Sequence, residues 1–279
     1  MSLITLNDGF SIPQFGFGTW QIPDEQARDR VAEALEIGYR HIDTAQMYGN
    51  ESGVGRAIAE SGIPREELYV TTKLNNNNHA PDRVISSLGD SLERLGLDHV
   101  DLFLIHWPLP EIDIDYVDTW NAMITARGTG QTRSIGVSNF TAENLRRITG
   151  PDSVVPAVNQ IEVHPYLAQN DLRAVDAELG IATEAWSPLA MGTVFEDPQL
   201  AAIAERAGHP VSAIVIAWHL QRGDILFPKA SSAARIRENF EAQNVQLDAE
   251  TIAAIDALDE GRRIGPDPVT FNWVPADEV

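Results

Sequence analysis

Four ionisable side chains lie at or near the ends of short apolar segments. Asp43, Lys73 and His106 each end such a segment, and Tyr48 follows Asp43 by five residues. A phenol has a pKa of about 10, so near neutral pH it donates a proton only beside a positive charge that stabilises the phenolate. Lys73 can supply that charge, and lowering the phenol pKa by about 3 units takes about 4 kcal/mol. With neutral His106 donating a hydrogen bond to a substrate oxygen, the set predicts proton transfer to a carbonyl group.

Each of these residues also has an ordinary structural explanation. Asp43 could cap a helix, His106 could be a hydrogen-bonded core histidine, and the stem of Lys73 could extend to solvent. The joint pattern favours a site, because several polar groups in a row follow apolar segments and would be costly to bury without partners. A carbonyl reduction also needs a hydride, which no side chain supplies, so the pattern predicts a bound cofactor.

The segments that carry these groups alternate with amphipathic stretches along the chain. Apolar residues in those stretches recur at helical spacing, as at Val84, Leu88, Leu92 and Leu95. Strand segments that are each followed by a helix predict a closed α/β barrel of the (β/α)8 or TIM type, whose active site lies at the carboxyl ends of the strands. The eight predicted strands are 15–18, 40–43, 68–73, 100–106, 132–137, 157–160, 181–186 and 225–227.

Both ends of the chain lie outside this alternation. Segments 3–6 and 10–12 flank an Asn-Asp-Gly turn and predict an N-terminal β-hairpin. From Gly261 onward we expect a C-terminal tail over the barrel mouth. Its aromatic residues Phe271 and Trp273 either line a pocket there or simply pack the end of the barrel.

The composition excludes several classes of function. The net charge of −21, from 20 Lys and Arg against 41 Asp and Glu, predicts no binding to nucleic acid or anionic membranes. Cysteine is absent and no histidine spacing resembles a metal site, so we expect no metal. No secretory signal is recognisable and the apolar run 213–218 is too short to span a bilayer, which predicts a cytoplasmic protein. We expect residues 1–279 to form one domain, since no linker interrupts the pattern.

Four stretches carry a family resemblance. They are GYRHIDTAQMYGNE at 38–51, LFLIHWP at 102–108, GVSNF at 136–140 and NQIEVHPY at 159–166. The chain resembles the aldo-keto reductases from about residue 6 to residue 259, and among them the bacterial 2,5-diketo-D-gluconate reductases. The resemblance implies a TIM barrel that binds extended NADPH without a Rossmann domain. It places the family's catalytic tetrad on Asp43, Tyr48, Lys73 and His106.

The resemblance also implies the residues that hold the cofactor and the substrate. Ser138, Asn139 and Gln160 would contact the nicotinamide carboxamide, Trp186 would stack on the ring, and the pyrophosphate would lie along Ser187, Pro188 and Leu189. The adenosine phosphate would meet Lys229, Ser231, Arg235, Glu238 and Asn239, where a helix N-terminus and a small basic cluster suit the 2′-phosphate of NADP. The substrate would meet Tyr48, His106, Trp20 and Trp107, although the two tryptophans could equally pack the rim.

Two positions depart from the family pattern. Many members have Ser where this chain has Ala230, so one phosphate-binding hydroxyl is missing and the preference for NADPH over NADH becomes a question for experiment. Many members have an aromatic residue where this chain has Asn75, which would widen or hydrate the substrate pocket.

We therefore expect an NADP-dependent oxidoreductase that reduces aldehydes and ketones to alcohols. The resemblance suggests keto-sugars and small dicarbonyls as its small-molecule substrates, and we expect a monomer. One alternative is a non-catalytic barrel that binds NADPH as a sensor or for a protein partner. Another is a barrel enzyme of different chemistry, such as a phosphosugar isomerase, whose activity would not depend on the Tyr48 phenol.

Overall fold

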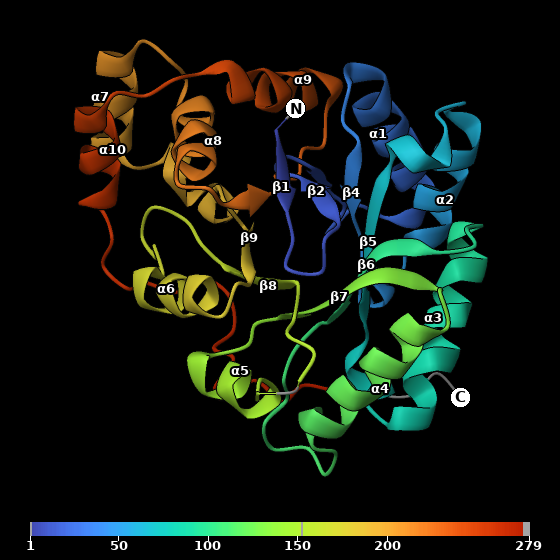
Figure 1. The fold of residues 1–279 in the computed structure, drawn as a ribbon. Coiled ribbons are helices and arrows are strands. Elements are labelled where there is room, and N and C mark those ends of the chain that lie inside the picture. Colours follow the sequence, from blue (N-terminus) through green and yellow to red (C-terminus); the bar gives the residue numbers. More distant parts are fainter. Residues whose placement is uncertain (1, 152, 276–279) are drawn as a thin grey trace.

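The computed structural model describes residues 2–151 and 153–275. Parallel strands run side by side in the order β10-β9-β8-β7-β6-β5-β4-β3, and helices surround them (Figure 1). The ring closes where Phe15, just before β3, bridges in parallel to Leu226 of β10. The predicted (β/α)8 barrel is therefore confirmed. Its strands are β3 (Phe17–Gly18), β4 (His41–Asp43), β5 (Tyr69–Leu74), β6 (Val100–Ile105), β7 (Thr132–Ser138), β8 (Val158–Glu162), β9 (Ala182–Trp186) and β10 (Ile225–Leu226).

Each of the eight predicted strand segments overlaps one of these strands. Three strands continue past their predicted ends: β5 and β7 by one residue each, and β8 by two residues to Glu162. β8 continues because Glu162 still pairs with Trp186 of β9. Lys73 and Gln160 thus lie just inside their strands, and the polar residue that ends β8 is Glu162.

Helices fill the connections, and several begin with a clear cap. Thr141 opens α5 with a capping box, and the carboxylate of Asp197 accepts hydrogen bonds at the start of α7. Asp24 opens α1 and ties it to α2, because its Oδ1 accepts from the backbone N–H of Gly53 at 2.6 Å. The α-helices are α1 (Asp24–Ile37), α2 (Glu51–Glu60), α3 (Pro81–Leu95), α4 (Tyr116–Gly128), α5 (Ala142–Ile148), α6 (Asn170–Glu178), α7 (Pro198–Ala207), α8 (Val211–Gln221), α9 (Ala233–Glu241) and α10 (Ala249–Asp256). Short 3-10 turns are η1 (Gln46–Tyr48), η2 (Arg65–Glu67), η3 (Asn76–Asn78), η4 (Ala190–Phe195) and η5 (Ala242–Asn244).

The predicted N-terminal hairpin covers the end of the barrel opposite the mouth. β1 (Leu3–Thr5) pairs antiparallel with β2 (Ser11–Pro13), and Asn7 donates to the carbonyl of Pro156, just before β8 begins. Figure 1 shows the hairpin in the middle of the ring of strands. With this end covered, ligands can reach the barrel interior only from the carboxyl ends of the strands.

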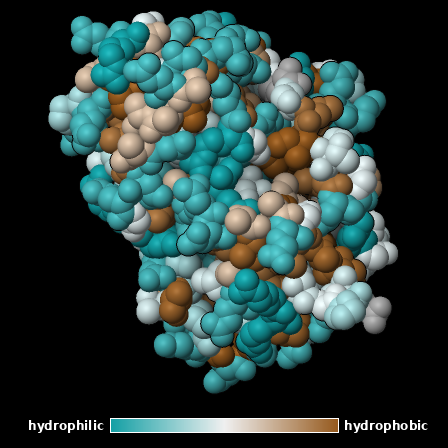
Figure 2. Space-filling view, turned by 60° about the vertical axis from the view of Figure 1, so that its left-hand side comes forward, coloured by the Kyte–Doolittle hydropathy of each residue, from teal (hydrophilic) through white to brown (hydrophobic). Residues whose placement is uncertain are grey.

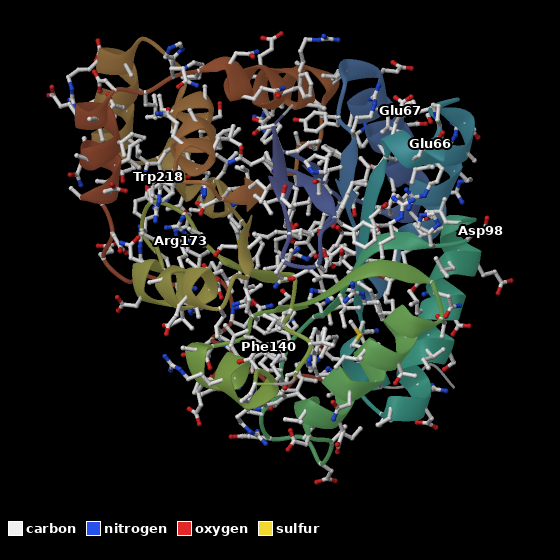
Figure 3. The ribbon with its side chains drawn as sticks, viewed as in Figure 1. Glu66, Glu67, Asp98, Phe140, Arg173 and Trp218 are labelled. Atoms are coloured by element: carbon white, nitrogen blue, oxygen red, sulfur yellow. The ribbon has the colours of Figure 1, made fainter. Side chains whose placement is uncertain are left out.

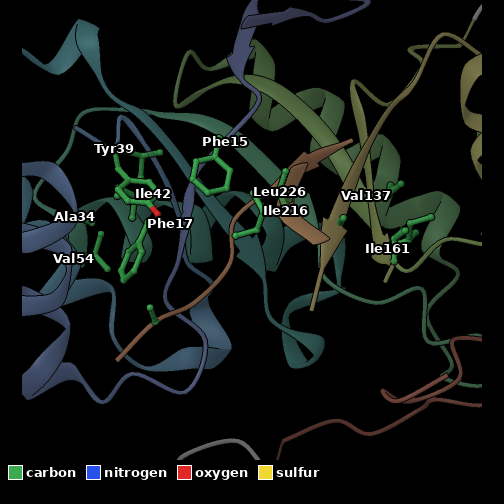
Figure 4. Packing of buried hydrophobic residues seen from close by; sticks show 14 of the residues in the cluster. Phe15, Phe17, Ala34, Tyr39, Ile42, Val54, Val137, Ile161, Ile216 and Leu226 are labelled. Atoms are coloured by element: carbon green, nitrogen blue, oxygen red, sulfur yellow. The ribbon is translucent and has the colours of Figure 1, made fainter. Parts of the chain in front are cut away.

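The apolar residues form two cores, one on each side of the strands. The larger core lies between the strands and the surrounding helices and includes Phe17, Tyr39 and Ile42 (Figure 4). The smaller core fills the barrel interior next to the hairpin and includes Leu102 and Val158. Charged residues such as Glu66, Glu67 and Asp98 lie on the outer rim in Figure 3, and hydrophilic residues cover most of the face drawn in Figure 2. Burial of the apolar residues in the two cores provides the main driving force for folding.

The tail after α10 crosses the mouth, as the sequence predicted. The amide of Asn76, in the loop after β5, donates to the carbonyl of Trp273 at 2.8 Å. Glu111 lies in the loop after β6, and its backbone N–H donates to the side-chain oxygen of Asn272 at 2.8 Å. Within the described residues no single helix is long and apolar enough to cross a membrane, and the α7–α8 pair that passes the test jointly is bent by 81°.

Candidate active site

The four residues of the expected tetrad meet at the carboxyl ends of β4, β5 and β6. Lys73 is completely buried, and its Nζ donates to Asp43 Oδ1 at 2.7 Å, to the Thr44 carbonyl at 2.9 Å and to Tyr48 Oη at 3.2 Å. The rings of Tyr48 and His106 lie edge to face with 5.7 Å between their centroids. The three hydrogen bonds of Lys73 Nζ join residues at least 25 positions apart in the sequence, so the fold brings distant parts of the chain together at this site.

The loop that carries Tyr48 is fixed by two amide side chains. Asn50 is buried; its Nδ2 donates to the carbonyls of Thr19 and Ile22 at 2.9 and 2.8 Å, and its Oδ1 accepts from Thr44 Oγ1 at 2.7 Å. Gln46, in the same 3-10 turn as Tyr48, donates to α3 and accepts from the loop after β5. These contacts hold the turn that carries the half-buried Tyr48 ring, and Lys73 of β5 contacts the ring from the barrel side.

Burial and the Lys73 charge act on the Tyr48 hydroxyl in opposite directions. Burial raises the pKa of Tyr48 above 10, and the Lys73 ammonium lowers it by a smaller amount. Lys73 therefore acts in the direction expected from the sequence, but the expected net decrease of the pKa is wrong for this structure. The pKa of Lys73 itself is raised, because Asp43 and Tyr48 together outweigh the desolvation that lowers it. At neutral pH the site thus holds a protonated phenol beside an ammonium ion.

His106 is a neutral imidazole at the same mouth. Burial lowers its pKa well below 6.5, and the charge of Lys73 lowers it further. Its Nδ1 is buried and makes no hydrogen bond with any described residue. Its backbone carbonyl accepts from Asn139 Nδ2 at 2.9 Å, which links it to the next strand connection.

The residues expected to hold the nicotinamide form one hydrogen-bonded group next to the tetrad. Gln160 Nε2 donates to Asp43 Oδ2 at 3.0 Å, and Ser138 Oγ donates to the Gln160 carbonyl at 2.9 Å. Asn139 Nδ2 donates to Ser138 Oγ at 3.1 Å, and Trp186 Nε1 donates to Asn139 Oδ1 at 2.8 Å. The structure therefore brings these four residues together and connects them to Asp43.

A cleft of roughly 330 Å³ gathers all five residues expected at the adenosine phosphate. Its lining includes Leu189, Lys229, Ala230, Ser231, Arg235, Glu238 and Asn239, together with Phe195 and Ser212. Lys229 and Arg235 are exposed and form no ion pair within the described part of the chain, whereas Glu238 accepts from Ser212 Oγ at 2.7 Å. Two unpaired cations near the start of α9 fit a phosphate group. Ser187 and Pro188 do not line this cleft, but they connect Trp186 to Leu189.

Aromatic residues border the space in front of the tetrad. Trp107 is buried and packs against Phe271 of the tail with 4.3 Å between centroids, and against Trp186 at 6.4 Å. Trp20 follows β3 and is 41% exposed, and Trp273 is 53% exposed. These rings offer an apolar wall to a small organic substrate.

Sequence reasoning missed two buried carboxyl groups near this site. Glu184 of β9 accepts from Gln160 Nε2 at 2.8 Å, and burial raises its pKa to about 8. Glu162 ends β8 and accepts hydrogen bonds from the tail. Strand periodicity could have found both, because Glu162 lies two residues after Gln160, and Glu184 two residues before Trp186, on the same face of their strands. Their partners could not have been read from the sequence.

Comparison with known proteins identifies the family. Residues 13–260 match the Aldo/keto reductase family. An aldo-keto reductase of Mycolicibacterium smegmatis is 50% identical over 270 residues, covering 97% of this chain and 98% of the relative. The methylglyoxal reductase DkgA of Escherichia coli is 44% identical over 272 residues, covering 97% and 98%.

Solved structures give the same result. A Bombyx mori aldo-keto reductase in complex with NADP superimposes with a TM-score of 0.89 at 40% identity, covering 95% of each chain. A mutant of Gox0644 in complex with NADPH superimposes with a TM-score of 0.92 at 39% identity, covering 98% of this chain and 99% of the other. Sequence and structure agree over nearly the whole length of these proteins, and this chain belongs to the aldo/keto reductase family.

Proposed function

We propose that this protein reduces small aldehydes and ketones to alcohols with NADPH, and that Tyr48 donates the proton. The observation that carries the proposal is the contact of Lys73 Nζ with Tyr48 Oη at 3.2 Å, made while Asp43 holds the same ammonium at 2.7 Å. Because Lys73 donates to the phenol oxygen, the phenol hydrogen is left for another acceptor. A carbonyl oxygen in front of Tyr48 would be that acceptor.

The surrounding residues support proton transfer in this direction. The raised pKa of Tyr48 keeps the proton on the phenol until a substrate oxygen becomes more basic. Lys73 then stabilises the phenolate that remains, in a site where low hydration strengthens the attraction. Neutral His106 can donate a hydrogen bond from one ring nitrogen to the same substrate oxygen and so orient the carbonyl.

The residues present fit NADPH. When bound, NADPH supplies the hydride for the carbonyl carbon. Trp186 and the amide groups of Asn139 and Gln160 would hold its nicotinamide beside the tetrad, and the cleft with Lys229 and Arg235 would hold its adenosine phosphate. Lys229 and Arg235 have no ion-pair partner among the described residues, and on a protein of net charge −21 they favour a doubly charged phosphate over a neutral ribose hydroxyl.

We propose small dicarbonyls and keto-sugars as the substrate class. The methylglyoxal reductase among the relatives supports dicarbonyls, and the apolar wall of Trp107 and Phe271 suits a small molecule. Asn75 replaces an aromatic residue of many family members and caps η3 in the loop after β5. A polar residue there supports substrates that carry hydroxyl groups, such as keto-sugars.

The change Tyr48→Phe tests the proton donor. It removes one oxygen and keeps the ring, so we expect kcat for methylglyoxal to fall by about 100-fold or more, as for loss of a general acid. The Kd for NADPH, measured by calorimetry, should stay close to that of the unchanged protein. Phenol-independent turnover would point to a different chemistry in the barrel. NADPH binding without turnover of any carbonyl by the unchanged protein would favour the non-catalytic alternative.

The changes Lys229→Ala and Arg235→Ala test the phosphate cleft. Each removes a charge-assisted contact, so we expect the Kd for NADPH to rise about tenfold or more, while the Kd for NADH changes little. Arg83→Ala is the matched control, since it removes one exposed positive charge from α3, away from the cleft. An equal loss of affinity for NADPH and NADH would contradict a phosphate contact.

Three further expectations from the sequence stay predictions. We expect one domain over residues 1–279, action in the cytoplasm and a monomer that binds neither nucleic acid nor membranes. Light scattering on the purified protein tests the monomer, and limited proteolysis tests the single domain.

A further inference from the structure

The indole of Trp186 is held at one edge by a side chain and at the other by the tail backbone. Its Nε1 donates to Asn139 Oδ1 at 2.8 Å. At the opposite end of the ring lies Gly265: a Cβ on Gly265 would collide with Trp186 Cη2 and lie 2.9 Å from Cζ3. Any side chain at position 265 therefore requires the indole to move.

Gly265 cannot easily retreat, because a buried carboxylate holds the tail at this point. Glu162 is completely buried, and its Oε1 accepts from the backbone N–H groups of Ile264 at 2.6 Å and Gly265 at 3.0 Å. His164 Nε2 contacts the same oxygen at 3.0 Å, and Arg263 donates to Oε2 at 3.2 Å. Hydrogen bonds to a carboxylate are stronger than neutral ones, so this attachment is rigid.

Glu162 and Trp186 are also register partners on neighbouring strands. The carboxylate that fixes the tail and the ring that the tail touches therefore start from adjacent points of one rigid sheet. Beyond position 265 the tail continues to Phe271, which packs on Trp107, itself in ring contact with Trp186. The tail thus contacts the indole directly at Gly265 and indirectly through two further rings.

We propose that Gly265, held by the carboxylate of Glu162, is a positioning residue that fixes the orientation of the Trp186 indole. This inference rests on the proposed function, in which Trp186 lies against the nicotinamide. A ring fixed before binding loses less conformational freedom when a ligand arrives, so its fixation raises affinity without a new contact. The absence of a side chain at position 265 then sets cofactor affinity from outside the cofactor site.

The change Gly265→Ala tests the inference in two ways. In the protein without ligand, NMR should show the Trp186 indole N–H signal moving upfield, as its hydrogen bond to Asn139 weakens; Trp186→Phe assigns the signal by removing it. Calorimetry should show the Kd for NADP rising about fivefold or more, as for loss of one hydrogen bond. Gly89→Ala in α3 is the matched control and should change neither quantity, because its Cβ has only Gln131 Nε2 at 3.9 Å as a neighbour.

A second background separates the indole from the tail. Cη2 and Cζ3 are absent from phenylalanine, so in the Trp186→Phe protein the further change Gly265→Ala should leave the Kd for NADP unchanged. If Gly265→Ala alone reduces the yield of folded protein, the double variant with Trp186→Phe should restore that yield. An unmoved indole signal, an unchanged Kd, or an equal loss of affinity in both backgrounds would overturn the inference.

The test of the Gly265 inference and the test of the proposed function can fail independently of each other. Turnover of methylglyoxal with NADPH by the unchanged protein tests the function, whereas the indole signal is read without any cofactor. A protein that reduces carbonyls but shows an unmoved signal in Gly265→Ala retains its function and loses only this inference.

Discussion

Lys73 is the residue on which the chemistry and the local stability of the site both depend. Its ammonium is completely buried and has a carboxylate, a carbonyl and a phenol as acceptors. We expect Lys73→Met to lower kcat by about 100-fold or more, because the phenolate of Tyr48 loses its counter-charge. We also expect the free energy of unfolding in urea to fall by about 3 kcal/mol, since Asp43 is left as an unpaired buried carboxylate.

The double change Asp43→Asn with Lys73→Met separates these two effects. Removing both charges leaves no unpaired buried ion, so the free energy of unfolding should recover most of the loss. Activity should not recover, because the phenolate still lacks its cation. A double variant as active as the unchanged protein would show that the pair serves the fold alone.

At the residue scale, the sequence predicted which groups meet but not how they titrate. Asp43, Lys73 and His106 could be recognised because each ends an apolar segment. The pKa of Tyr48 could not be predicted, because it depends on how deeply the loop is packed. That depth is set by Asn50 and Gln46, whose partners lie in the loop after β3, on α3 and in the loop after β5.

At the element scale, Asn50 joins the loop after β3 to the loop that carries Tyr48. We expect Asn50→Ala to lower the free energy of unfolding by about 3 kcal/mol, because the buried carbonyls of Thr19 and Ile22 lose their donor. We expect kcat to fall as well, since the turn with Tyr48 is no longer held over Lys73. Thermal unfolding and steady-state kinetics on the same preparations check both effects.

Asn121→Ala is the control for this change. Asn121 is exposed on α4, so its replacement should alter stability by only about 0.5 kcal/mol or less. A large loss of stability in Asn50→Ala with unchanged kcat would mean that the loops fold together without positioning the phenol.

The strands and helices themselves could be predicted well from apolar spacing and capping residues. Thr141 and Asp197 begin helices as their types indicate, and all eight strand segments overlap strands. The end of β8 was predicted two residues early, because the partners that allow the carboxylate of Glu162 to be buried cannot be read from the sequence. Its burial depends on Ile264 and Gly265, about a hundred positions later, and no local pattern reports such a contact.

At the scale of the whole molecule, buried ionisable groups set the pH range in which the fold is stable. Burial lowers the pKa of His41 and His79 from 6.5 to about 4, so between these values the unfolded chain binds protons that the folded chain does not. Stability therefore falls as pH decreases from 6.5 to 4, by about 3 kcal/mol for each such histidine. His106 and His219 act in the same direction.

Two buried carboxyl groups limit stability on the alkaline side. Burial raises the pKa of Glu184 from 4.5 to about 8 and that of Asp176 from 3.8 to about 7. Here the folded chain binds the extra protons, so this contribution is complete below the unfolded pKa and is lost as pH rises through the folded pKa. Because the contribution of these four histidines levels off above pH 6.5, we expect urea unfolding to give the highest free energy near that pH and a decline toward pH 8.

The change Glu184→Gln isolates the alkaline limb. The amide has nearly the same shape and can still accept from Gln160, but it does not ionise. Relative to the unchanged protein, the variant should therefore gain stability as pH rises from 6 to 8, approaching about 1.4 kcal/mol for each pH unit at most. Parallel stability curves for the two proteins over this range would mean that Glu184 is already ionised in the folded protein. The buried cluster beneath Lys73 would then carry two carboxylates against one ammonium.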